Sequence, residues 1–348
     1  MPEAHSGTLQ GMAPPTTSTV CWIERKPRSL GNFSIEASYR SMHDAWPEGH
    51  TRPDRHVASR FTKGIWNRFR IWREVGRLPH RILHITGDIH FAAIGRRRPV
   101  VLTIHDLGML DEGPGWKRRL KSWFWLTWPL QSCDRIIAVS DTTKADILRR
   151  TDFPADRIDV IPSVISPSYH LRTAPPNHAV PRLLHIGLAD NKNLAGHAAA
   201  LQGLSVHLRI IGEPSPTQLD LLRQHDIDFS WAARLSEAEL QQEYAEADAL
   251  LFCSTLEGYG MPIIEAQTIG VPVITSDRSP MRETAGGGAL LANPDDPSDI
   301  RRAVVELLDN ATQRESHVQL GLANAQRCSA SASAEAHAKL YERLLAAR

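Results

Sequence analysis

The sequence predicts an α/β protein with two parallel-sheet domains that face each other across a cleft. Short apolar runs alternate with amphipathic segments, which is typical of parallel strands covered by helices on both faces. A chain of 348 residues is also too long for one ordinary core. The proline-rich stretch 172–181 interrupts this alternation, which then restarts, so we interpret it as the linker between two domains.

The first domain is expected at residues 19–172. Residues 1–18 have neither an apolar core nor a basic lead-in, so they are interpreted as a disordered tail and not as a signal peptide. Ser140 or Asp141 is suited to cap a helix that ends in arginines. Apolar, β-branched runs predict strands at 19–24, 81–88, 100–104, 135–139 and within 156–169.

The second domain is expected at 173–328, and 329–348 is expected to be a helix that packs back on the first domain. Strands are predicted at 182–188, 206–212, 248–254 and 271–276. Helices are predicted at 193–204, 215–225, 236–247, 262–270, 299–310 and 333–347. Pro262 suits a first helical position, where its missing N–H would be unpaired anyway, and Gly270 ends that helix.

The composition narrows the class of protein. Apolar residues make up 42% and charged residues 23%, as in soluble globular proteins. The sequence contains no run of 18 or more apolar residues, so no membrane-spanning helix is expected. The four cysteines are far apart and form no C-x-x-C pair, so neither a metal site nor a disulfide framework is expected, and a reducing cytoplasm is the expected location.

Charge is distributed unevenly along the chain. Met1–His170 has 25 Lys and Arg against 17 Asp and Glu, whereas the remainder has 15 against 22, for a net charge of +1. This asymmetry suggests that the first half meets an anionic partner, although solvated faces that simply differ in charge would look the same. Nucleic acid is a poor candidate, because the net charge is near zero and no binding motif is present.

The segment Ser254–Ser276 carries the clearest site pattern. Ligands of parallel sheets collect beyond the carboxyl ends of the strands. Here Gly258, Tyr259 and Gly260 precede a helix N-terminus whose N–H groups suit an anion such as a diphosphate, and Glu265 is expected in the first helical turn. Glu257 and Glu265 would repel phosphate but suit hydroxyl groups. A phosphate flanked by polyols is a nucleotide sugar, whereas in the alternative interpretation both carboxylates are structural.

The same segment, "STLEGYGMPIIEAQTIGVPVITSD", resembles the E-x7-E signature of the family 4 (group 1) retaining glycosyltransferases of the GT-B fold. The similarity continues through "SPMRETAGGGALLANPDDPSDI", and it includes "LLHIGLADNKNL", "VVLTIHDLGML" and "DRIIAVSDTTKADIL". It covers roughly residues 20–310. The resemblance implies two Rossmann-like domains and transfer of a mannose-like or glucose-like hexose, with retention of anomeric configuration, from a GDP- or UDP-linked donor. The implied acceptor is a hydroxyl of a glycan or a lipid-linked glycan.

The resemblance also implies roles for individual residues. Glu265 would hold the donor ribose, Glu257 would face the transferred sugar, and Lys192 would neutralise the diphosphate as the leaving group gains charge. His105 would lie beside the reacting sugar across the cleft. His105, Lys192 and Glu257 are thus the expected catalytic residues. The remaining expected donor-binding residues are Gly187, Asn193, Gly212, Arg234, Gly258, Tyr259, Gly260 and Met261.

One departure from the family concerns the diphosphate. Many relatives pair an arginine with the lysine on the diphosphate, but Asn191 precedes Lys192 here. Arg234 is the one substitute that we suggest. On the acceptor side we expect Gly31, the remainder of a Gly-Gly pattern, together with His90 and Asp106, although Asp106 also suits a structural role. The departure keeps open the alternative of a non-catalytic nucleotide-sugar-binding or assembly protein. A nucleotide-sugar epimerase on the same fold is a second alternative, and the E-x7-E context speaks against it.

Two further expectations concern metal and membrane. The resemblance implies metal-independent transfer without a cofactor, and the sequence has no D-x-D motif to hold a metal–diphosphate complex. In "WKRRLKSWFWLTWPL", four tryptophans lie among cations, which suits peripheral contact with an anionic membrane at its inner face. A helix that packs the tryptophans into the core and exposes its charges is the alternative.

Overall fold

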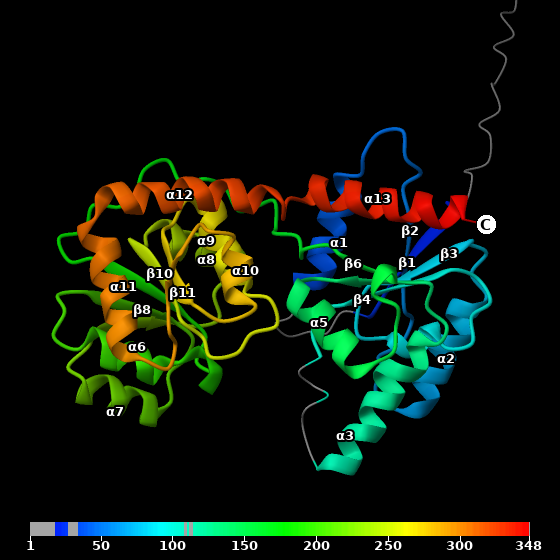
Figure 1. Ribbon diagram of the computed structural model, residues 1–348, viewed down its shortest axis with the longest axis horizontal. Coiled ribbons are helices and arrows are strands. Elements are labelled where there is room, and N and C mark those ends of the chain that lie inside the picture. Colours follow the sequence, from blue (N-terminus) through cyan, green and yellow to red (C-terminus); the bar gives the residue numbers. More distant parts are fainter. Residues whose placement is uncertain (1–17, 27–33, 108–109, 111–113, 348) are drawn as a thin grey trace, which may run out of the picture.

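The computed structural model describes residues 18–26, 34–107, 110 and 114–347. Two six-stranded sheets form the centres of two domains, and helices pack around each sheet (Figure 1). Every strand pair in both sheets is parallel. The structure therefore confirms the predicted α/β class with two parallel-sheet domains.

The N-terminal sheet has the strand order β2-β1-β3-β4-β5-β6. The order reverses between β1 and β3, so this domain has its topological switch point there. Its strands are β1 (Val20–Glu24), β2 (Asp54–Val57), β3 (Ile82–Ile85), β4 (Val100–Ile104), β5 (Arg135–Ala138) and β6 (Ile158–Val160). Its helices are α1 (Ser34–Asp44), α2 (Ile65–Gly76), α3 (Gly115–Ser122), α4 (Trp128–Leu130) and α5 (Asp141–Arg150), and a π-helical turn, Trp123–Thr127, joins α3 to α4.

The C-terminal sheet has the order β12-β11-β10-β7-β8-β9, with its switch point between β7 and β10. Its strands are β7 (Arg182–Ile186), β8 (His207–Ile211), β9 (Asp228–Ala232), β10 (Ala249–Phe252), β11 (Val273–Ser276) and β12 (Leu290–Ala292). The helices of this part of the chain are α6 (Leu194–Leu201), α7 (Pro216–Gln224), α8 (Glu237–Ala245), α9 (Met261–Ile269), α10 (Met281–Ala285), α11 (Pro297–Asp309) and α12 (Ala311–Gln326).

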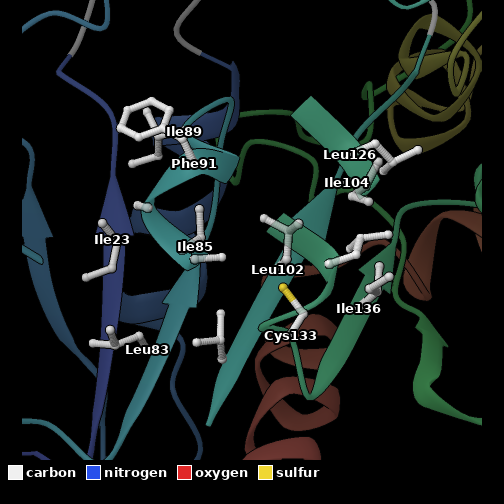
Figure 2. Packing of buried hydrophobic residues seen from close by; sticks show 14 of the residues in the cluster. Ile23, Leu83, Ile85, Ile89, Phe91, Leu102, Ile104, Leu126, Cys133 and Ile136 are labelled. Carbon is white, nitrogen blue, oxygen red and sulfur yellow. The ribbon is translucent and has the colours of Figure 1, made fainter. Parts of the chain in front are cut away.

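Apolar side chains in register hold the N-terminal sheet to its helices. Ile23, Ile85, Leu102 and Ile136 are register partners on adjacent strands, and all are fully buried. Figure 2 shows this row packed with apolar residues from the connecting segments, among them Phe91 and Leu126. Because both faces of a parallel sheet are covered, its strands consist of almost continuous apolar residues, as the sequence pattern indicated.

The last helix, α13 (Ala330–Ala346), packs on the N-terminal domain although it follows the C-terminal domain in sequence. In Figure 1, α12 lies along the C-terminal domain and α13 continues over the N-terminal domain. Trp22 Nε1 in β1 donates a hydrogen bond to the Tyr341 hydroxyl at 2.7 Å, and both side chains are buried in one apolar cluster. The chain thus crosses between the domains twice, at the linker and between α12 and α13.

The sequence-based scheme misses several elements. Strands β2 and β9 lie at the sheet edges, and their residues are only partly buried or exposed, so they lack the apolar signal of central strands. Strand β12 and helices α1, α2, α10 and α12 were not predicted either. Glu265 is the fifth residue of α9, whose first turn contains no acidic residue, so its expected place in the first turn was wrong.

Candidate active site

The loops that follow β7 and β10 meet at the C-terminal switch point. Asn191 links the two loops by hydrogen bonds. Its carbonyl accepts from Thr255 N at 2.8 Å, and its side-chain amide donates to Leu256 O at 2.7 Å. Loops from the two strands at a switch point form the usual ligand crevice of such a sheet. This juxtaposition brings the expected residues 187–193 and 257–265 to one edge of the domain.

Lys192 and Glu257 form an ion pair at this crevice. Lys192 Nζ lies 2.6 Å from Glu257 Oε1 and 4.8 Å from the centre of the Phe252 ring. The side chains are 19% and 13% exposed, so the pair is partly shielded from water. Gly187 has φ +86°, and a Cβ there would lie 3.1 Å from Lys192 Cε. Glycine at this position therefore leaves room for the lysine stem to reach the crevice.

Glu265 lies on α9 behind these loops. Tyr244, which is fully buried, donates its hydroxyl hydrogen bond to Glu265 Oε2 at 2.5 Å. Burial raises the pKa of the Glu265 carboxyl, and the bond from Tyr244 works in the opposite direction. The hydroxyl orients the carboxylate, and Tyr244 was not among the expected site residues.

The glycine-rich loop before α9 touches the other domain. A Cβ at Gly258 would lie 3.1 Å from Asp106 Cβ, so the two domains approach closely here. Gly260 has φ +99° and precedes the first residue of α9. Tyr259 is 8% exposed and its hydroxyl lies 3.2 Å from Cys328 Sγ, which makes its side chain part of the core. Its expected donor contact could therefore involve only its backbone.

Three other residues that were expected to bind the donor make structural contacts within the C-terminal domain. Asn193 caps α6, since its side chain accepts from Gly196 N and donates to Cys253 O and Pro294 O. Gly212 has φ +142°, and a Cβ there would meet Leu188 at 2.7 Å, which indicates tight packing. The Arg234 side chain is 89% exposed and pairs with Glu213 at 3.5 Å after the edge strand β9.

Arg278, which was not among the expected site residues, is a cation closer to the switch point than Arg234. It follows β11, the neighbour of β10, and its Nη1 donates to Thr255 O at 3.1 Å, while Nη2 donates to Asp295 Oδ2 at 2.5 Å. Thr255 is the residue whose N–H bonds to Asn191. The sequence signal for Arg278 was its position directly after "VPVITSD", at the end of a predicted strand.

His105 and Asp106 follow β4 and face the loop at Gly258 from the N-terminal domain. His105 Nε2 lies 3.0 Å from Thr86 O, and because a carbonyl only accepts, Nε2 carries the proton and Nδ1 keeps its lone pair. Burial lowers the pKa of His105, which favours the neutral ring. His90 Nδ1 donates to Trp125 O at 2.8 Å, so this residue joins helical segments of its own domain. Gly31 lies outside the described residues.

A cavity of about 230 Å³ opens beside this interdomain contact. Its walls come from both domains and from α13. His105 and Asp106 contribute from the segment after β4, and Gly258, Tyr259 and Met261 from the loop before α9 and its first residue. Ser333 and His337 contribute from α13. Met261, one of the expected donor-binding residues, therefore borders the cleft.

The described residues contain neither a metal-binding cluster nor a membrane-spanning helix. No group of three or more His, Cys, Asp or Glu side chains is arranged to hold a metal ion in the part of the chain that the structure describes. Within the same residues, no helix is long and apolar enough to cross a bilayer. The cysteines Cys21, Cys133, Cys253 and Cys328 are buried and free.

Two facing parallel-sheet domains with a lysine at the C-terminal switch point define the GT-B class of glycosyltransferase architecture. Family models agree: "Glycosyltransferase Family 4" matches residues 31–169, and "Glycosyl transferases group 1" matches residues 180–310. The chain belongs to this glycosyltransferase family, which confirms the resemblance seen in the sequence.

Curated relatives share part of their length with this chain. It is 29% identical over 226 residues to O-antigen chain mannosyltransferase B of Escherichia coli, covering 58% of this chain and 58% of that protein. It is 26% identical over 227 residues to O-antigen chain mannosyltransferase RfbU of Salmonella typhimurium, covering 62% and 64%. The matches thus span less than two thirds of either relative.

Solved structures resemble the whole described fold. Sucrose-phosphate synthase of Thermosynechococcus elongatus has a TM-score of 0.73 at 17% identity, with 94% of this chain and 99% of that chain covered. Anabaena HepE, in complex with UDP and glucose, has a TM-score of 0.67 at 15% identity, with 93% and 99% covered. At these identities the likeness establishes the GT-B fold.

Proposed function

We propose that this protein is a hexosyltransferase that moves mannose, or else glucose, from a GDP- or UDP-linked donor to a hydroxyl of a glycan or lipid-linked glycan. The observation that carries the proposal is the Lys192–Glu257 pair at the switch point, with Glu265 behind it and His105 across the cleft. Mannose is supported by the relatives named as O-antigen mannosyltransferases.

The two charges of the pair suit the two ends of the donor. A diphosphate would attract Lys192 Nζ away from Glu257, and the cation would then stabilise the charge that develops on the leaving group. The released Glu257 carboxylate would accept hydrogen bonds from hydroxyls of the transferred sugar. Arg278 would add positive charge nearby, because the guanidinium already bonds to the Thr255 carbonyl of the same loop.

Glu265 suits the ribose. Its Oε2 is held by Tyr244, and Oε1 would accept from a ribose hydroxyl beyond the helix N-terminus. His105 keeps an unprotonated Nδ1, so it can accept a hydrogen bond from a sugar hydroxyl in the cleft. We propose retention of anomeric configuration and independence from metal as the family resemblance implies. Transfer that survives excess EDTA, with an α-linked product from an α-linked donor, would support both.

Product analysis tests the activity. Purified protein is incubated with GDP-mannose, UDP-glucose and other nucleotide sugars, together with mannoside and glucoside acceptors, and products are followed by mass spectrometry. We expect one donor to yield a glycoside, and Glu257→Ala to abolish it. Nucleotide binding without hydrolysis or transfer for every donor would favour the non-catalytic alternative, and a changed sugar in the recovered nucleotide would favour the epimerase.

Peripheral attachment to the cytoplasmic face of an anionic membrane is a second part of the proposal. On α3 and the turn that follows, Trp116, Leu120 and Trp123 are 66%, 59% and 46% exposed. On α2, Ile65 and Trp66 are 81% and 78% exposed. The two helical segments are neighbours, because Arg68 of α2 lies 4.9 Å from the centre of the Trp125 ring. Trp125 itself packs against the core. The alternative interpretation, in which the tryptophans pack into the core, therefore holds for part of this helix.

Cations accompany these exposed side chains. Arg70, Arg73, Arg118 and Arg119 are exposed on the same two helices. Exposed tryptophans beside arginines suit the interface of an anionic bilayer. We expect cosedimentation with vesicles of phosphatidylcholine and phosphatidylglycerol but not of phosphatidylcholine alone, and loss of binding in the double variant Trp66→Ser/Trp116→Ser. Equal sedimentation of variant and parent would remove this part of the proposal.

A further inference from the structure

Asn191 stands at the position where the family resemblance led us to expect an arginine on the diphosphate, and the structure gives it other partners. It lies in the short 3-10 turn Asp190–Lys192, which follows β7. Its backbone carbonyl accepts a hydrogen bond from Thr255 N at 2.8 Å, and its side-chain Nδ2 donates to Leu256 O at 2.7 Å. Both the main chain and the side chain of Asn191 therefore bind the loop that follows β10.

The amide of Asn191 also faces the Glu257 carboxylate. Nδ2 lies 3.5 Å from Glu257 Oε1, at the outer limit of a hydrogen bond, and Lys192 Nζ lies 2.6 Å from the same oxygen. Because a carbonyl and a carboxylate only accept, these contacts require that Nδ2, and not Oδ1, faces Leu256 and Glu257. Among the described residues, Lys192 and Asn191 are the hydrogen-bond partners of the Glu257 carboxylate, and no third one is present.

Core packing does not fix the segment that precedes Glu257. The Leu256 side chain is 67% exposed, so it does not anchor the loop in the apolar interior. Arg278 binds the loop one residue earlier, where its Nη1 donates to Thr255 O at 3.1 Å. The position of Leu256 and Glu257 relative to β7 therefore depends on the hydrogen bonds of Asn191.

This dependence becomes larger once a donor is bound. In the proposed function, the diphosphate attracts Lys192 away from Glu257, which leaves the amide of Asn191 as the partner of the carboxylate within the described chain. One amide N–H occupies one of about four lone-pair positions of a carboxylate, so the others can accept from sugar hydroxyls. A guanidinium at position 191 would instead bind Glu257 by charge-assisted hydrogen bonds and compete with those hydroxyls.

We propose that Asn191 is a positioning residue that holds Leu256 and Glu257 in place for the transferred sugar, and that it thereby determines how well the site distinguishes a nucleotide sugar from the bare nucleoside diphosphate. The replacement of a cation by an amide is then a change of role at this position: Lys192 attracts the diphosphate, and Asn191 supports the carboxylate that binds the sugar. This inference rests on the proposed function, from which the role of Glu257 comes.

The binding test compares two ligands that share the diphosphate and differ in the sugar. Isothermal titration without acceptor measures the Kd of GDP against GDP-mannose, and of UDP against UDP-glucose. Asn191→Ala removes the amide and keeps the backbone bond to Thr255. We expect it to raise the Kd of the donor about three- to tenfold, the range that corresponds to one neutral hydrogen bond, and to leave the Kd of the nucleoside diphosphate unchanged.

Asp190→Asn is the matched control, because Asp190 is an exposed residue of the same turn. The ratio of the two Kd values should stay as in the wild-type protein, since both ligands carry the diphosphate and both would feel the lost charge. Asn191→Gln, which keeps an amide, should recover part of the donor affinity that Asn191→Ala loses. A merely structural role would weaken both ligands alike in Asn191→Ala, and that result would overturn the inference.

Asn191→Arg separates the inference from the view that this chain simply lacks a cation. If a cation were missing, restoring it should raise kcat in the transfer reaction. We expect kcat to fall and the preference for the nucleotide sugar to weaken, because the guanidinium would occupy Glu257. A kcat above that of the wild-type protein, or an unchanged donor Kd in Asn191→Ala, refutes the positioning role and leaves the transferase activity standing. Wild-type protein that binds none of the four nucleotides refutes the proposed function and this inference together.

Discussion

Glu265 is the residue whose proposed role is most directly measurable. Replacing it by Ala removes the charged acceptor for the ribose hydroxyls, and we expect nucleotide affinity to fall by ~1–3 kcal/mol. Isothermal titration with GDP and UDP measures the loss. Tyr244→Phe is the matched control, because it removes the hydroxyl that orients Glu265 and leaves the carboxylate in place, so only a small loss is expected. Unchanged affinity in Glu265→Ala would contradict the ribose assignment.

Lys192 is predicted to act on the leaving group more than on ground-state binding. Lys192→Met keeps an apolar stem beside Phe252 but removes the charge, and kcat should fall by about 10²–10³-fold, as when a group that stabilises transition-state charge is removed. Steady-state kinetics with saturating donor measures the change. Arg234→Met is the control, since this exposed side chain pairs only with Glu213 among the described residues. A comparable loss in the control would instead favour Arg234 as the missing cation.

At the residue scale, strand-end positions were predictable and side-chain directions were not. His105, Lys192 and Glu257 follow apolar runs, and such residues reach the ligand edge of a parallel sheet. Tyr259 and Asn193 stand in the same loops, yet the first points into the core and the second caps a helix. Those directions depend on contacts with distant residues such as Cys328 and Pro294, which spacing along one sequence does not contain.

At the element scale, α13 is held to the N-terminal domain by a hydroxyl at the centre of the interface. The Tyr341 hydroxyl accepts from Trp22 Nε1 and bonds to His84 Nδ1. Tyr341→Phe leaves both nitrogens without a partner in the core, so the free energy of unfolding should decrease by ~1–3 kcal/mol. Urea denaturation followed by tryptophan fluorescence measures it. Lys339→Ala removes an exposed ion pair on the same helix and should change stability by less than about 1 kcal/mol; equal losses would refute the anchoring role.

Differences in burial between the elements explain which of them the sequence pattern missed. Central strands such as β4 are buried throughout and apolar at every position except Thr103, so their pattern is unambiguous. The edge strands β2 and β9 are partly exposed and rich in polar residues, so they lack it. The Trp-rich helix was ambiguous for a different reason. It exposes Trp116 and buries Leu126, so both interpretations of its sequence describe part of it.

At the scale of the whole molecule, the cavity between the domains takes its walls from distant parts of the chain. The segment after β4 supplies His105, the loop before α9 supplies Gly258, and α13 supplies His337. The two-domain plan was predictable from the restart of the strand–helix alternation after the linker. The contribution of α13 to the cleft was not, because it follows from a three-dimensional crossing for which His337 gives no local sequence signal.

Buried histidines should make the stability of the molecule depend on pH. Burial lowers the pKa values of His84, His185, His197 and His337, with His185 and His337 at about 4. The unfolded chain binds protons near pH 6.5 and the folded chain does not, so stability is fully present above pH 6.5 and decreases as the pH falls toward 4. Each independent histidine contributes a slope of about 1.4 kcal/mol per pH unit. Because His185 and His197 contact each other at 2.9 Å, they do not titrate independently.

Glu265 opposes this trend, since its raised pKa means that the folded state takes up a proton more readily than the unfolded chain. Because one carboxyl group opposes several histidines, the net effect of acid is a loss of folding stability. Urea midpoints measured from pH 7.5 to pH 5 should therefore fall, and His337→Gln should show a shallower slope because one buried ring no longer titrates. A midpoint that stays constant over this range would mean that the buried rings accept protons in the folded state as readily as in water. A slope unaltered by His337→Gln would remove His337 from the set that causes the fall.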